Sequence, residues 1–72
     1  MTKREALAEA RRRWGKYAWV RYERGGWRYA DCPWYQVGEI DTVLVVKGES
    51  NTWEAAFADA DRRKKEVKGN GG

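Results

Sequence analysis

The sequence lacks histidine altogether and contains one cysteine and one proline among its 72 residues. The single cysteine, Cys32, has no partner for an internal disulfide, and a lone thiol is typical of a reducing, intracellular setting. The ligands from which zinc sites are usually built are also missing. We therefore expect a fold that depends on neither a disulfide nor a metal.

Catalytic patterns are equally scarce. No histidine can act as a base, and the charge of Asp31 beside Cys32 opposes formation of a thiolate. Gly25-Gly26 lacks the lysine and the following helix of a phosphate-binding loop. The sequence therefore predicts a protein that is not an enzyme and needs no cofactor.

Long apolar runs are absent, since none exceeds the four residues 43–46. From this pattern we expect neither a secretory signal nor a membrane-spanning helix, and a soluble, cytoplasmic protein with no membrane partner. The length allows one domain. We predict that it covers residues 1–67, followed by a disordered glycine-rich tail at 68–72.

Aromatic residues are abundant, with five tryptophans, four tyrosines and one phenylalanine. They are densest in residues 17–34, where alternation on both sides of Gly25-Gly26 predicts a β-hairpin with this pair as its two-residue turn. That register sets Glu23 opposite Arg28. A three-residue loop would instead pair Glu23 with Trp27 and reverse the faces of the second strand.

The two-residue register divides the hairpin side chains between two faces. It places Val20, Tyr22 and Tyr29 in the core and leaves one tryptophan and two arginines on the exposed face. Such residues stack on the bases of single strands, and they are also preferred in protein-binding hot spots. The resulting candidate for a protein- or base-contacting site consists of Trp19, Arg21 and Arg28.

Helices are predicted at both ends of the chain. Thr2 and Glu5 form a capping-box pattern, and Gly15 is a glycine of the kind that ends helices. Together they indicate a helix over residues 2–13. A turn at 38–41 and an apolar strand at 42–47 follow the hairpin. Asn51 and Glu54 form a second capping-box pattern before a helix over about 52–67, whose apolar stripe contains Trp53, Ala56, Phe57 and Ala60. The predicted fold class is α+β, in the order α-β-β-β-α, with a three-stranded antiparallel sheet and both helices on one face.

Charge is segregated along the chain, with a net charge of +4. Residues 1–24 carry eight cations against three anions, residues 25–61 two against seven, and residues 62–72 five against one. If the helices lie parallel on one face, their basic ends reach the same edge and can contact phosphates, although the same cations also compensate the helix dipoles. The candidate nucleic-acid site consists of Arg11, Arg12, Arg13, Lys16, Arg62, Arg63, Lys64 and Lys65.

The element order, the length and the segment Gly48-Glu49-Ser50 before the last helix resemble the double-stranded-RNA-binding-domain fold over nearly the whole chain. In that family a lysine-rich segment opens the last helix and contacts phosphates; here residues 51–56 read Asn-Thr-Trp-Glu-Ala-Ala. The amino-acid patterns of residues 6–15 and 52–60 are also similar to those of short phage and prophage proteins, and this resemblance implies a small accessory role.

Two functions follow as expectations. The first is a binding module that contacts nucleic acid, DNA or RNA, through its basic helix ends. The alternative is a phage-type interaction module or inhibitor of a host protein that uses the aromatic sheet face, and the acidic middle segment favours it. A monomer and a homodimer paired through that face both fit the sequence.

Overall fold

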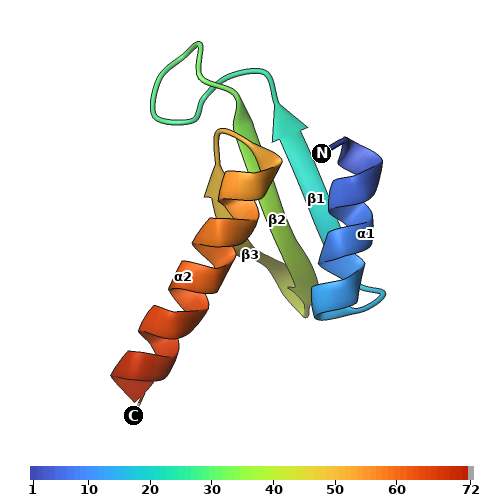
Figure 1. Ribbon diagram of the computed structural model, residues 1–72, viewed down its shortest axis with the longest axis vertical. Coiled ribbons are helices and arrows are strands. Elements are labelled where there is room, and N and C mark those ends of the chain that lie inside the picture. The colour runs from blue at the N-terminus through green and yellow to red at the C-terminus, as the bar shows by residue number, and fades with distance from the viewer. Residues whose placement is uncertain (72) are drawn as a thin grey trace.

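The computed structural model describes the backbone of residues 1–71 and the side chains of residues 1–65. The elements are α1 (Lys3–Trp14), β1 (Ala18–Glu23), β2 (Trp34–Asp41), β3 (Val43–Ser50) and α2 (Trp53–Gly71). The strands form one antiparallel sheet in the order β1-β2-β3. Both helices lie on the same face of this sheet and run in the same direction, α1 mainly on β1 and α2 mainly on β3 (Figure 1). The predicted α+β class is confirmed, and within the described residues no helix is long and apolar enough to cross a membrane.

The start of α1 follows directly from its local sequence. The Thr2 hydroxyl accepts a hydrogen bond from the Glu5 amide at 3.1 Å, and the Glu5 carboxylate accepts one from the Thr2 amide at 2.7 Å. This reciprocal pair satisfies two amides that the first turn leaves without helical partners. Gly15, with φ 84°, ends the helix as predicted.

The predicted hairpin around Gly25-Gly26 is wrong. β1 pairs with β2, so that Glu23 stands opposite Trp34 instead of Arg28, and residues 24–33 form a loop. The observed pairing places Tyr35 and Val37 of β2 beneath the helices, where Val37 is fully buried. Tyr29, expected in the core, is 70% exposed in the loop.

The remaining turn predictions also shift. Residues 38–41 belong to β2, and the chain reverses at Thr42, whose φ is 69°. β3 continues through Gly48 to Ser50, with an irregularity in the β2–β3 register between Val37 and Gly38. The turn therefore uses a single residue with positive φ where the sequence indicated a glycine-led turn.

The core lies between the sheet and the two helices. Val37 is fully buried at its centre, and the alanines of both helices let the backbones approach closely. The cap of α2 is Thr52, whose hydroxyl accepts from the Ala55 amide at 3.0 Å, and not the predicted Asn51. The buried core residues are Ala6, Ala10, Val37, Trp53, Ala56, Phe57 and Ala60, which include the predicted stripe of α2.

The last helix is longer than predicted. α2 extends to Gly71, past the expected helix end at Val67. Gly72 lies outside the described residues, and side chains are described only as far as Lys65. The division into a domain at 1–67 and a tail at 68–72 stays a prediction.

Candidate functional site

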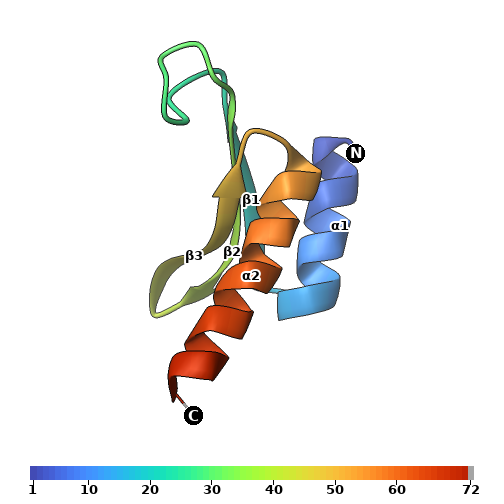
Figure 2. The same ribbon diagram turned by 60° about the vertical axis from the view of Figure 1, so that its left-hand side comes forward.

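The two basic helix ends come to the same end of the molecule. The Met1 amine lies 3.1 Å from the Glu54 carboxylate at the start of α2, and Arg13 near the end of α1 reaches Asp61, beside the basic stretch of α2, at 2.8 Å. Figure 2 shows α1 and α2 side by side on the sheet. The predicted juxtaposition of the C-terminal part of α1 with α2 is therefore present, and it forms a groove.

This groove, called here the basic groove, is bounded by the end of α1, by β3 and by α2. Five cationic residues line it, Asp61 is its one acidic residue, and four apolar residues complete the lining. It encloses about 1110 Å³. Its lining residues are Arg12, Arg13, Trp14, Val45, Val46, Lys47, Ala60, Asp61, Arg63 and Lys64.

Two arginines of α1 are held by carboxylates. Arg12 and Arg13 both pair with Glu9, Arg13 at 2.7 Å, and Arg13 also reaches Asp61 of α2 at 2.8 Å. The hydrogen bonds from Arg12 and Arg13 lower the pKa of Glu9 to about 2. Arg13 further lies over the Phe57 ring, 4.8 Å from its centroid, and so ties the two helices together.

The arginines of α2 are anchored in the same way. Arg63 bridges Glu49 at 3.0 Å and Asp59 at 2.9 Å, and Arg62 pairs with Asp59. Burial raises the pKa of Asp59, but hydrogen bonds from the Glu49 amide and from Arg62 outweigh it, and the net shift is downward. Four of the eight predicted phosphate-contacting cations are therefore engaged with carboxylates of the chain itself.

The other four predicted cations differ in position. Arg11, Lys64 and Lys65 have no carboxylate partner among the described residues, and only Lys64 lines the groove. The Lys16 ammonium lies 5.2 Å from the centroid of the Tyr17 ring. The residue that sequence reasoning missed is Lys47, 3.5 Å from Glu39; its place in an apolar strand was the available signal.

The sheet face opposite the helices carries part of the second predicted site. Trp19 is half-buried there, and its indole N–H donates to the Glu39 carbonyl at 3.0 Å. Arg21 is exposed on the same face and pairs with Glu23 at 2.6 Å. Arg28 is not on this face, because it belongs to the loop. The structure therefore separates Arg28 from Trp19 and Arg21.

This uncovered face also has an apolar end. In the register, Trp19 stands beside Gly38 and Val46, and Ile40 stands opposite Leu44 on the same face. Ile40 is 50% exposed and Leu44 67% exposed. Exposed apolar side chains grouped on one face mark interaction surfaces more often than scattered ones do.

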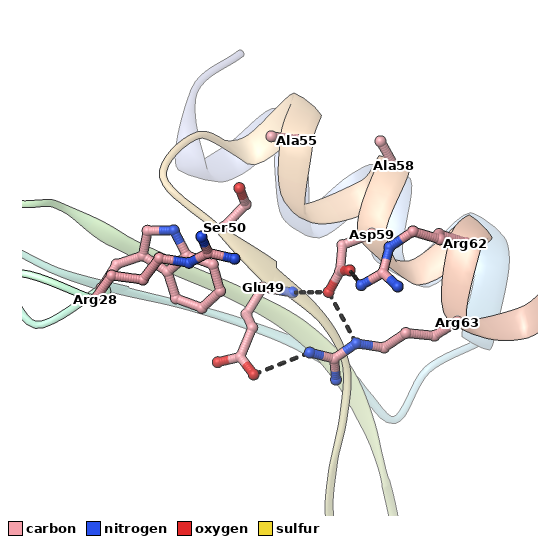
Figure 3. A pocket seen from close by; sticks show the side chains of 9 residues that line it. Arg28, Glu49, Ser50, Ala55, Ala58, Asp59, Arg62 and Arg63 are labelled. Atoms are coloured by element: carbon pink, nitrogen blue, oxygen red, sulfur yellow. Dashed lines mark hydrogen bonds and ion pairs between the residues drawn. The ribbon is translucent and has the colours of Figure 1, made fainter. Parts of the chain in front are cut away.

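A second pocket, called here the loop pocket, lies between the loop, the end of β3 and α2; it is open to solvent and has a volume of about 620 Å³ (Figure 3). The Arg28 guanidinium lies over the Trp27 ring, 5.3 Å from its centroid. Sequence reasoning missed this pocket because it assigned Trp27 and Arg28 to a strand. Its lining residues are Trp27, Arg28, Glu49, Ser50, Ala55, Ala58, Asp59, Arg62 and Arg63.

Within the part of the chain that the structure describes, no group of three or more acidic or cysteine side chains is arranged to hold a metal ion. Comparison of the chain with models of protein families, with curated proteins and with solved structures finds no match. The likeness to the double-stranded-RNA-binding-domain fold is therefore one of topology, with helix, three antiparallel strands and helix in that order.

Proposed function

We propose that this protein is a small nucleic-acid-binding module that holds a phosphate backbone along the basic groove. The observation that supports it is the convergence of five cations from α1, β3 and α2 around one groove with a single carboxylate in its lining. Cations gathered in a groove of this kind attract a polyanion and release its counterions.

The ion pairs of the groove are compatible with this role. A guanidinium has five N–H donors, and the bonds of Arg12 to Glu9 and of Arg63 to Glu49 and Asp59 use two of them in each residue. The remaining donors are left for phosphate oxygens. The carboxylates also hold the guanidinium groups in fixed positions, which lowers the entropy lost when an anion binds.

Contacts of this type position a nucleic acid and do not read its sequence. We therefore expect DNA and RNA of different sequences to bind with similar affinity. Binding should weaken steeply with salt, with a slope of about 0.9 per neutralised phosphate in a plot of log affinity against log salt.

The test is a titration of labelled DNA and RNA, double- and single-stranded, at two or more salt concentrations. Arg12→Ala combined with Lys64→Ala should lower the affinity. It should also reduce the slope of log affinity against log salt by the amount expected for about two lost phosphate contacts. Lys3→Ala combined with Arg4→Ala removes the same charge from the opposite end of α1 and should change binding far less. Absence of binding at low salt refutes the proposal.

A second candidate is a protein-interaction module, which includes an inhibitor of a host protein as carried by phages. The uncovered sheet face supports it, because Ile40 and Leu44 are exposed there beside Trp19. Capture from a host lysate with wild type and with Leu44→Ser tests it. If wild type and Leu44→Ser capture the same proteins, this sheet face is not the binding site.

A further inference from the structure

We infer that the loop pocket accepts one unpaired nucleotide, with its base against the Trp27–Arg28 pair and its phosphate beside the pocket arginines. This inference rests on the proposed function and names the form of nucleic acid that the molecule prefers. Three observations carry it: the walls of the pocket, its charge, and its position relative to the basic groove.

The first wall is the Trp27–Arg28 pair. The Trp27 amide donates to the Cys32 carbonyl at 3.1 Å, which holds the half-buried residue in place within the loop. Arg28 is exposed, with φ 64°, and its guanidinium stays on the indole. Unpaired bases stack both on aromatic rings and on guanidinium planes.

The opposite wall is the first half of α2, and the floor is the end of β3 (Figure 3). Ala55 and Ala58 leave space on the helix side, where larger side chains would close the pocket. The Trp34 indole N–H donates to Glu49 at 2.8 Å, and Glu49 in turn pairs with Arg63. This network fixes the floor before any ligand arrives.

The arginines of the pocket favour an anion, and the Trp27 ring favours a ligand that also has a flat face. Its lining contains three arginines against the two carboxylates of Glu49 and Asp59, and both carboxylates already accept hydrogen bonds from the chain. Arg28 has no carboxylate partner among the described residues. A bare phosphate or an acidic peptide would leave the Trp27 ring unused, whereas a nucleotide uses both the ring and the cations.

The pocket also adjoins the basic groove. Arg63 lines both, so a strand that follows the groove reaches the loop pocket across one turn of α2. A pocket of about 620 Å³ is within the usual size of a small-ligand site, and it takes a base only when that base is out of a duplex stack. We therefore expect preference for single strands.

The experiment compares a labelled single strand of about six nucleotides with the same strand in abasic form, which keeps the phosphates and removes the bases. Wild type should bind the strand with bases about tenfold more tightly than the abasic strand, which is the ratio of affinities expected for one stacked base. Trp27→Ala should bring this ratio close to one, and Trp27→Phe should retain most of it. Tyr29→Ala removes an exposed ring of the same loop that does not line the pocket, and should leave the ratio unchanged.

Two results overturn the inference. One is equal affinity of wild type for the two strands; the other is an equal effect of Trp27→Ala and Tyr29→Ala, with folding of both variants verified by circular dichroism. If duplex binding and its dependence on Arg12 and Lys64 persist in either case, the proposed function stands and only this inference fails. If no nucleic acid binds at low salt, both fail.

Discussion

Substitution of Gly48 by alanine should separate α2 from the sheet. Gly48 pairs with Val37 and lies directly beneath the helix. A β-carbon at this position would lie 2.6 Å from the Ala60 amide nitrogen and 3.0 Å from the Ala60 α-carbon, and would overlap the Ala56 carbonyl oxygen. All three atoms belong to the backbone, so no side-chain rotation relieves the contact, and the helix has to move by about 1 Å to restore ordinary separations of about 3.5 Å.

The expected magnitude follows from the small size of the domain. Overpacking of a tight core costs about 1–3 kcal/mol and occasionally more, and the backbone contacts here place Gly48→Ala at about 3 kcal/mol. At about 0.05–0.15 kcal/mol per residue, the chain has a free energy of unfolding of about 4–11 kcal/mol. The substitution therefore removes a large share of the stability.

Urea unfolding followed by tryptophan fluorescence measures this loss. Gly15→Ala is the matched control, because a β-carbon there meets nothing within 4 Å and only the positive φ of 84° opposes it. We expect that control to lose about 1 kcal/mol. A smaller loss for Gly48→Ala than for Gly15→Ala would refute the close approach of α2 to β3.

Two further predictions concern turn strain and pH. Thr42→Gly should raise the free energy of unfolding by about 0.5–1 kcal/mol, because a β-branched residue at φ 69° is strained and glycine is not; urea unfolding checks it, and a loss of stability would contradict it. Glu9, whose pKa is lowered to about 2 in the folded chain, contributes stability above its unfolded pKa of about 4.5 that is lost as the pH falls towards 2. Glu9→Gln should remove this part of the pH dependence, and thermal melting between pH 7 and pH 2 measures it. Parallel plots of melting temperature against pH for wild type and Glu9→Gln would show that the Glu9 ion pairs do not stabilise the fold.

Local signals predicted the helices well. The capping box of Thr2 and Glu5 and the stripe through Trp53 and Phe57 depend on residues a few positions apart, so the sequence alone contains them. The common direction of the helices then follows from the element order. It brings the basic ends together without any information about individual contacts.

The hairpin was mispredicted because a local turn signal competed with burial at a distance. Gly25-Gly26 is a strong two-residue turn pattern, yet pairing of Val20 with Val37 and of Tyr22 with Tyr35 places more apolar surface beneath the helices. This choice requires knowledge of which strand the helices cover, and no short window contains it. The loop pocket was missed for the same reason.

The ion pairs of the site were also beyond sequence reasoning. Arg63 and Glu49 are 14 residues apart and meet only because α2 lies along β3. Charge segregation predicted where cations gather but not how many of them are already paired. The sequence therefore indicated the place of the basic groove and overestimated its excess charge.

The carboxylate of Asp59 has a consequence for association between molecules. It accepts the Glu49 amide of β3 at 3.1 Å, which occupies a backbone donor on one outer strand of the sheet with a side chain of α2. Among the described residues no side chain blocks the backbone of β1, the other outer strand, in this way. An unpaired edge strand can add a strand from another molecule. A strand that added beside Glu49 would have to break its bond to Asp59, so the end of β3 near the loop pocket is protected against such pairing.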